Sequence, residues 1–434
     1  MQAKGNQRER KLQTDGSAGK IGKILISYYP NPNCKEKVGE FDLPRIKLLI
    51  VSDPLISGSV QLNLIRNIIS MLRDITSINI YSTYIDEDVK QTIEGANFLS
   101  AKHLFIFYKI YRQLYGNNES VLWFLSWFRE TVLHFNSKNV RNEIDPTEYN
   151  IILNIAQTIP VRADIYWGQS IPLDITLKEM QRSSIFVRAV PLSILSKIGK
   201  MDRSLIRKIS FMSKIVISNS RYTRSVYEGL GITVSFVVYS APILSDFRPS
   251  LKSNAGKYVL AYIGKETEIE TVLALARDGI NVVAFGSKIP AGTDLAELKH
   301  FTNFRGFVSK EELINLYSGA LFTIFPFHNE PLGMVPLESM ACGTPVLTYF
   351  KEGPSETVLH GISGWLAKDR EDFIRIAKIL WTNGAKLEIS DEMQDRARDF
   401  SNYGSGIGLR DLILNLTELQ AKLKEENVTE PHIV

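Results

Sequence analysis

Runs of apolar residues alternate with amphipathic stretches along most of the chain, which predicts strands and helices in turn. Residues 46–52 form a continuous apolar run, as in a parallel strand that helices cover on both faces. A glycine-bearing loop, a helical pattern between Leu62 and Leu72 and a second apolar run at 78–84 follow, which indicates a βαβ unit. Later runs predict strands at 151–155, 163–167, 185–190 and 214–218. The first half of the chain therefore predicts a doubly wound parallel sheet.

The alternation restarts after a proline-bearing segment at 239–250. Further strands are predicted at 258–263, 281–285, 301–306, 321–326, 344–349 and 364–367. We place the boundary between two Rossmann-like domains near Asp246–Ser253. The chain then divides into a disordered basic tail (1–20), a first domain (21–248), a second domain (249–400) and C-terminal helices (401–434).

Composition narrows the class of protein. The chain has 434 residues, of which 44% are hydrophobic, enough for two cores. A net charge of +4 gives no whole-molecule footprint for nucleic acid. Its two cysteines exclude a disulfide scaffold and a multi-cysteine metal site, and low cysteine use fits a reducing cytoplasm. No apolar run reaches the roughly 18–20 residues of a membrane span, so we expect a cytoplasmic protein, soluble or bound to a surface.

The stretch with the most chemical information surrounds two glutamates. Glu330 follows the predicted strand 321–326 and therefore lies at the carboxyl edge of the sheet, where ligands bind in such folds. Pro331 and Gly333 then open a helix, whose free N–H groups suit a diphosphate. Glu338, eight residues after Glu330, lies about two helical turns on and can accept two ribose hydroxyls. The spacing alone carries little weight, because two glutamates eight apart are common.

The residues around these glutamates resemble the donor site of the retaining glycosyltransferases of family 4, which have the GT-B fold. The family pattern F-P-S-x-x-E-P-F-G-L-V-P-L-E-A-M-A-C-G-T-P-V appears here as F-P-F-H-N-E-P-L-G-M-V-P-L-E-S-M-A-C-G-T-P-V. The flanking N-F-R-G-F-V-S-K-E-E-L and E-G-P-S-E-T-V-L-H-G-I-S-G-W-L also fit. The resemblance implies an α/β fold of two Rossmann-like domains facing a cleft, with a C-terminal helix that crosses back to the first domain.

The resemblance also implies roles for single residues. Glu330 would stand beside the donor sugar at the reaction centre, and Glu338 would hold the ribose. The backbone of Leu332, Gly333, Met334 and Val335 would meet the sugar and the distal phosphate, and Phe307 and Val308 would border the base. The family works without a metal or other cofactor, so we expect only a nucleotide-sugar donor as bound ligand.

One part of the family pattern is incomplete. The family binds the diphosphate with an arginine and a lysine in G-R-x-x-x-x-K-G, whereas this chain reads G-K-E-T-E-I-E-T. Gly264 matches the glycine, and Lys265 replaces the arginine, which keeps the charge but loses the bidentate fork. The second lysine has no equivalent. An unaligned lysine such as Lys288, or a cation from a partner, could compensate.

The first domain matches more loosely. S-D-P-L-I-S-G-S resembles the family's first glycine-bearing loop, which places Gly58 and Ser59 on the acceptor and phosphate side; an ordinary turn glycine is the alternative. The histidine by which the family often contacts the sugar is missing. Asp164, Trp167 and Gln169 lie near the equivalent strand end, and the sequence does not choose among them.

Two segments suggest a membrane surface. Residues 103–135 are crowded with aromatics, including Trp123 and Trp127, interleaved with basic residues, which suits an interfacial contact or, equally, a core-facing helical pair. Residues 197–224 carry many lysines and arginines and few acids, which suits anionic lipid or a phosphate-bearing acceptor, or a solvated helix face.

We therefore expect a retaining glycosyltransferase that moves a hexose from a GDP- or UDP-hexose to a glycan hydroxyl. The segment V-V-Y-S-A-P-I-L resembles the hinge of enzymes that extend lipid-linked oligosaccharides, so a polyprenyl-linked acceptor is expected, with the protein peripheral on the inner face of the membrane. The open alternatives are a soluble transferase acting on a sugar or polysaccharide, a nucleotide-sugar epimerase and a non-catalytic scaffold.

Overall fold

The computed structural model describes residues 45–425 except 58, 101–118, 174–190, 241–243, 251–256, 288, 290–292, 386–389 and 401–407. The described residues belong to one compact unit, Arg45–Val434. The predicted tail, Gly58, Lys288 and the predicted strand 185–190 lie outside them. Among the described residues, no helix is long and apolar enough to cross a membrane.

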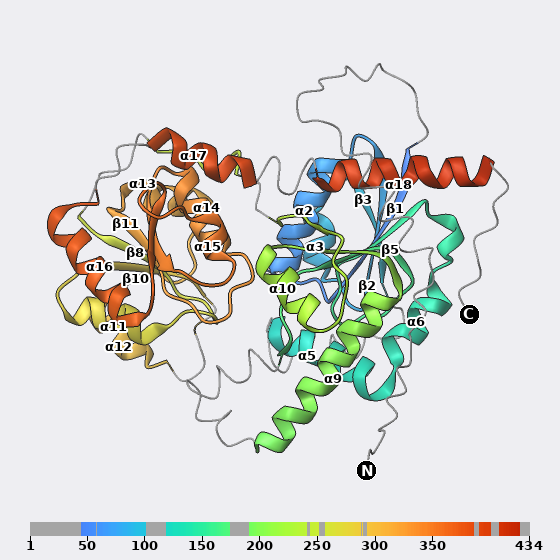
Figure 1. The fold of residues 1–434 in the computed structure, drawn as a ribbon, viewed down its shortest axis with the longest axis horizontal. Helices are drawn as coiled ribbons and strands as arrows, with labels where there is room; N and C mark the ends of the chain where they lie inside the picture. The colour runs from blue at the N-terminus through green and yellow to red at the C-terminus, as the bar shows by residue number, and fades with distance from the viewer. Residues whose placement is uncertain are drawn as a thin grey trace, which may run out of the picture. The chain divides into compact units, whose positions relative to one another are not determined.

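The first half of the chain forms a seven-stranded parallel sheet in the order β3-β2-β1-β4-β5-β6-β7 (Figure 1). Its strands are β1 Ile46–Ser52, β2 Thr76–Ser82, β3 Ala96–Ser100, β4 Ile151–Asn154, β5 Ala163–Gly168, β6 Ser213–Ser218 and β7 Phe236–Val237. The helical elements between them are α2 Val60–Leu72, α3 Glu87–Thr92, α5 Glu119–Leu133, α6 Phe135–Glu143, η1 Pro146–Glu148, α9 Leu192–Phe211 and α10 Arg221–Gly229. Strand order reverses between β1 and β4, as expected for a doubly wound sheet.

The second half forms a six-stranded parallel sheet in the order β10-β9-β8-β11-β12-β13. Its strands are β8 Val259–Tyr262, β9 Val282–Phe285, β10 Asn303–Phe304, β11 Phe322–Phe325, β12 Val346–Tyr349 and β13 Gly364–Ala367. Its helices are α11 Ile269–Arg277, α12 Leu295–Phe301, α13 Lys310–Gly319, α14 Met334–Ala341, α15 Pro354–Thr357 and α16 Arg370–Asn383. One apolar cluster fills this half, with Val259, Ile324 and Leu347 fully buried at its centre.

Two helices complete the described chain. Helix α17, Ser390–Asp399, packs against α14. Helix α18, Gly408–Glu425, packs against β4 of the first sheet. Arg410 of α18 forms a two-pronged hydrogen bond with Asp74, each N–O distance being 2.7 Å, and Gln420 donates to Asp164 at 3.0 Å. The expected return of the C-terminal helix to the first domain is therefore confirmed, whereas the domain bounds remain predictions.

The aromatic helix α5 corrects one interpretation of the sequence. Trp127 was expected to suit a membrane interface, but it is 2% exposed and donates its indole N–H to Asp202 at 2.8 Å. Trp123 is half-buried and packs against the apolar cluster of the first half of the chain to which Trp127 belongs. The exposed apolar side chains of this helix include Phe124, Phe128 and Val132, which are 42%, 42% and 45% exposed. They are spaced by four and form one stripe of the helix.

Candidate active site

Glu330 lies on the loop that leaves β11 at the carboxyl edge of the second sheet, as the sequence predicts. Asn329 before it adopts a left-handed conformation, with φ of +55°. The Glu330 side chain then turns toward the start of α14, where its Oε1 accepts the backbone N–H groups of Leu332 (3.2 Å) and Gly333 (2.9 Å). The carboxylate therefore occupies donors that the resemblance assigns to the donor sugar and phosphate.

The environment of Glu330 favours its neutral form. Burial raises its pKa to about 7, and the negative charge of Glu266 acts in the same direction. The N–H groups of Leu332 and Gly333 and the charge of Lys265 partly oppose this rise in pKa. With a pKa of about 7, the Glu330 carboxyl group is present in both its neutral and its charged form at neutral pH.

The loop after β8 packs against the loop of Glu330. Backbone hydrogen bonds join His328 N–H to the Glu266 carbonyl at 2.7 Å and Glu268 N–H to the Pro326 carbonyl at 3.0 Å. Gly264 fits a close approach, since a Cβ there would lie 2.3 Å from the Tyr262 ring. The exposed Lys265 is thereby brought near Glu330. Gly264 and Lys265 therefore lie on the loop after β8, and their role toward a diphosphate remains a prediction.

Gly333 is the N-cap residue, directly before α14. Its φ is +86°, and a Cβ would lie 2.9 Å from Cγ of Pro354, so both conformation and space favour glycine. Met334 and Val335 form the first turn of α14, where the helix dipole favours an anion. The helix that Pro331 and Gly333 were predicted to open is present and spans Met334–Ala341.

Glu338 lies on α14, next to Tyr317 of α13. Its Oε2 accepts the hydroxyl of Tyr317 at 3.1 Å. Burial raises its pKa to about 7, while Tyr317 and the positive charge of Lys310 lower it. Burial, together with the Glu338 charge, raises the pKa of Tyr317 well above its ordinary value, so Tyr317 remains a donor. Glu338 can therefore accept a ligand hydroxyl in place of the Tyr317 hydroxyl, or accept both.

The remaining predicted site residues differ in burial and in their hydrogen bonds. Phe307, on the loop after β10, is 82% exposed, and Val308 packs against the core of this half. Ser59 is buried and caps α2, its Oγ accepting Leu62 N–H at 3.1 Å. A role of Ser59 toward a phosphate would therefore compete with this cap. No contact among the described residues links Phe307 to Glu338.

Two of the three residues considered for the missing histidine are already engaged. Asp164 lies at the start of β5, at the opposite edge of the sheet, and accepts Ile152 N–H at 2.8 Å. Trp167 is fully buried and donates to the Val238 carbonyl at 3.1 Å. Gln169 follows β5 at the carboxyl edge, and its Nε2 is buried without a hydrogen-bond partner among the described residues. Asp164 and Trp167 are thus engaged within the fold, whereas Gln169 has a donor at the carboxyl edge without a partner among the described residues.

Sequence reasoning missed two acidic residues on the segment after β12. Glu352 accepts the backbone N–H of Glu330 at 2.7 Å. Glu356, on α15, accepts the N–H groups of Arg221 (2.9 Å) and Tyr222 (2.7 Å) at the start of α10, and the hydroxyl of Tyr239 (3.0 Å). The letters E-G-P-S-E were part of the resemblance, but their partners lie too far along the chain for the sequence to indicate these bonds.

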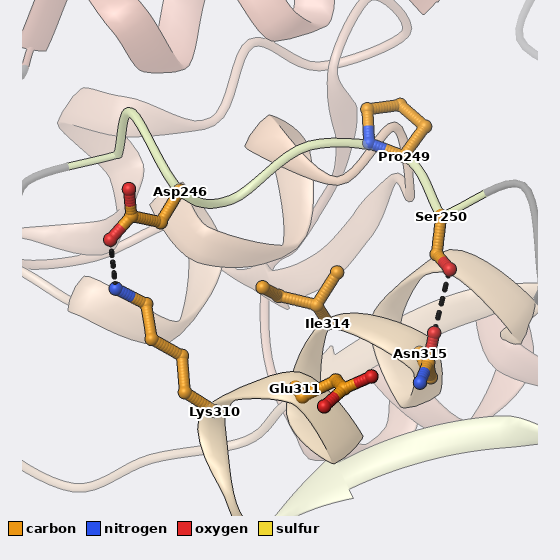
Figure 2. Close-up of a pocket in the computed structure, with 7 residues that line it drawn as sticks. All are labelled: Asp246, Pro249, Ser250, Lys310, Glu311, Ile314 and Asn315. Atoms are coloured by element: carbon orange, nitrogen blue, oxygen red, sulfur yellow. Dashed lines mark hydrogen bonds and ion pairs between the residues drawn. The ribbon is translucent and has the colours of Figure 1, made fainter.

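A cavity of about 660 Å³ lies beside the start of α13 (Figure 2). Its lining residues are Asp246, Pro249, Ser250, Lys310, Glu311, Ile314 and Asn315. Lys310 pairs with Asp246, and Ser250 Oγ donates to Asn315 Oδ1 at 2.6 Å. Neither Glu330 nor Glu338 lines this cavity, so it is distinct from the candidate active site.

Comparison with known proteins supports this interpretation of the second half. Residues 248–400 match the family Glycosyl transferases group 1. The D-inositol 3-phosphate glycosyltransferase of Streptosporangium roseum is 33% identical over 114 residues, 23% of this chain and 26% of that protein. The alpha-1,3/1,6-mannosyltransferase alg-2 of Neurospora crassa is 42% identical over 65 residues, 15% of this chain and 14% of that protein. The chain thus spans about a quarter or less of the length of these relatives.

Solved structures resemble almost the whole chain in fold. Sucrose-phosphate synthase from Thermosynechococcus elongatus has a TM-score of 0.62 at 17% identity, covering 88% of this chain and 100% of that one. Anabaena HepE in complex with UDP-glucose has a TM-score of 0.56 at 14% identity, covering 87% and 100%. At such identities the likeness establishes the fold alone. Residues 248–400 therefore resemble glycosyl transferases group 1, and the chain has the GT-B fold.

Proposed function

We propose that the chain is a retaining glycosyltransferase that moves a hexose from a UDP- or GDP-hexose to a hydroxyl of a polyprenyl-linked glycan. The observation that carries the proposal is the position of Glu330, whose Oε1 accepts the N–H groups of Leu332 and Gly333 before α14 and whose pKa the positive charge of Lys265 lowers. This arrangement combines a carboxylate, a cation and backbone N–H groups, which are the groups that such a transfer needs. The group 1 match over 248–400 supports donor binding by this half.

The proposed mechanism follows the charges that develop during transfer. Breaking the bond between the sugar and the diphosphate leaves positive charge on the sugar and negative charge on the leaving group. Glu330 would face the sugar, while Lys265 and the first turn of α14 would face the diphosphate. Glu338 would accept the ribose hydroxyls, with Phe307 and Val308 beside the base.

The reaction is proposed to need no metal, so EDTA should leave the initial rate unchanged.

A thermal-shift panel of UDP-glucose, UDP-galactose, GDP-glucose and GDP-mannose tests the proposed donor class. A ligand that binds only the native state stabilises it by about 2.7 kcal/mol at 100 times its Kd, which raises Tm by several degrees. We expect one base to give this shift with both of its sugars. A flat response to every nucleotide would contradict the proposal, and conversion of the sugar without an acceptor would favour the epimerase.

The exposed face of α5 supports the proposal that the acceptor is linked to a lipid. The stripe of Phe124, Phe128 and Val132 offers apolar surface, and exposed Lys197 and Lys200 lie on α9, which packs against α5. Apolar side chains beside basic ones suit an anionic membrane surface. The acceptor would then meet the protein at the inner face of the membrane.

Replacing Phe124 and Phe128 with serine should weaken cosedimentation with anionic liposomes by about tenfold, since burying two aromatic rings contributes up to a few kcal/mol. Both side chains are 42% exposed, and Phe124 also stacks on Trp127 with ring centroids 5.6 Å apart, so Tm should fall only modestly. The matched control is Ile379→Ser, an exposed apolar residue of α16. Salt should remove the part of the binding that the lysines contribute. Equal binding by wild type and double variant would favour the soluble transferase.

A further inference from the structure

Glu352 has a backbone conformation that its side chain disfavours. Its φ is +56°, in the left-handed region that glycine adopts readily and other residues seldom occupy. Among the described residues only His134, Asn329 and Glu352 are non-glycine residues with positive φ, and two of these three contact or adjoin Glu330. Strained backbone persists where the surroundings hold it, and such positions gather at functional sites.

The conformation serves a specific pair of bonds. Glu352 Oε2 accepts the backbone N–H of Glu330 at 2.7 Å, and Gly353 N–H donates to the Glu330 carbonyl at 3.1 Å. Two consecutive residues thus bind both backbone polar groups of Glu330. Gly353 also packs tightly, since a Cβ there would lie 2.1 Å from the Pro331 carbonyl oxygen. Ser355 Oγ donates to the Glu352 carbonyl at 2.7 Å and secures the loop from the other side.

We propose that Glu352 is a positioning residue that fixes the main chain of Glu330, and thereby the Glu330 carboxylate, at the reaction centre. The inference rests on the proposed function of Glu330. Glycine would adopt this backbone without strain but has no carboxylate to bind the Glu330 amide. A charged acceptor makes a shorter and stronger bond to N–H than a neutral one. The chain therefore keeps glutamate where backbone conformation alone favours glycine.

Glu352 also lies near the first half of the chain. The pKa of Tyr222, on α10, is raised to about 12, first by burial and then by the charge of Glu352. A substitution at Glu352 could thus act through Tyr222 instead of Glu330. The Tyr222→Phe variant separates the two routes, because it removes the hydroxyl and leaves the Glu352–Glu330 bond in place.

The test compares Glu352→Gly and Glu352→Gln. In the glycine variant we expect an unchanged or higher Tm, because backbone strain is relieved, together with amide exchange at Glu330 that is about tenfold faster. When Glu352→Gly is assayed with the donor selected by thermal shift, the kcat of the variant should fall about tenfold, while its KM for the donor stays within about twofold. Glutamine keeps a carbonyl acceptor for the Glu330 amide. Glu352→Gln should therefore restore most of the kcat and most of the protection of the Glu330 amide from exchange. His134→Gly relieves the same backbone strain away from the site and should leave kcat unchanged.

Each outcome decides the question. Unchanged exchange at Glu330 in Glu352→Gly, or faster exchange with an unchanged kcat, would overturn the positioning role. Faster exchange in Tyr222→Phe would assign the effect to α10 instead. Amide exchange needs no substrate, so this part of the test stands even if no donor in the panel is turned over. That last result would count against the proposed function and not against the Glu352–Glu330 bond.

Discussion

The Glu330→Gln variant is expected to lose about 100- to 1000-fold in kcat, the range found when one preorganised electrostatic group is removed from an active site. Glutamine retains an Oε1 that can accept the N–H groups of Leu332 and Gly333, so the loop should keep its shape. What disappears is the negative charge beside the developing sugar cation. Nucleotide affinity should stay within about twofold, because Glu330 is proposed to act on the transition state.

The same variant carries a signature in stability. The pKa of Glu330 is raised to about 7 from an ordinary value of 4.5, so between these pH values the folded protein binds more protons than the unfolded chain. The contribution of Glu330 to stability therefore falls as pH rises through this window. Glutamine does not titrate. Glu330→Gln should thus gain Tm relative to wild type between pH 5 and pH 8, and a constant Tm difference would contradict the raised pKa.

A matched control is available in the same half of the chain. Glu311 is an exposed glutamate of α13, and Glu311→Gln removes one negative charge away from Glu330. It should leave kcat and the pH dependence of Tm unchanged. If Glu330→Gln retained turnover within about threefold of wild type, a barrier change under about 1 kcal/mol, Glu330 would have no role at the reaction centre.

Periodicity and motif were sufficient to predict both sheets, because buried parallel strands are continuous apolar runs. The predicted strand 46–52 coincides with β1, and the helix predicted after Gly333 is α14. Strand β3, A-N-F-L-S, was missed because it has only five residues and polar Asn97 and Ser100 interrupt its apolar run, and β7 because it has only two residues. Such short edge strands are set by their neighbours in the sheet more than by their own residues.

The errors at the surface and the site have a different cause. In α5, aromatics occur on both faces, so spacing could not show that Trp127 is buried against Asp202, 75 residues away, while Phe124 is exposed. The role of Glu352 depends on a left-handed backbone that no local pattern encodes for a glutamate. Glu356 depends on partners at Arg221 and Tyr222, more than a hundred residues earlier. Motifs place residues on elements, whereas these bonds arise only when the elements pack.

Glu338 should give a different kinetic result from Glu330. In the proposed complex its carboxylate binds the ribose equally in ground and transition states, so Glu338→Ala should raise the nucleotide Kd and the donor KM together. Losing two charge-assisted hydrogen bonds accounts for an increase of about 10- to 100-fold, while kcat at saturating donor stays near wild type. Calorimetric titration with the free nucleoside diphosphate measures this directly.

The affinity of the wild type should also depend on pH through Glu338. Burial raises the pKa of Glu338 to about 7, so a large share of the protein carries a neutral carboxyl group at pH 6. Ribose hydroxyls bind a carboxylate more strongly than a carboxyl group, hence affinity should rise from pH 6 to pH 8. Glu338→Ala should lose this pH dependence, whereas Tyr317→Phe, which removes the hydroxyl donor, should retain it with a further raised Glu338 pKa. An unchanged nucleotide Kd in Glu338→Ala would refute ribose binding by this residue, whatever the outcome at Glu330.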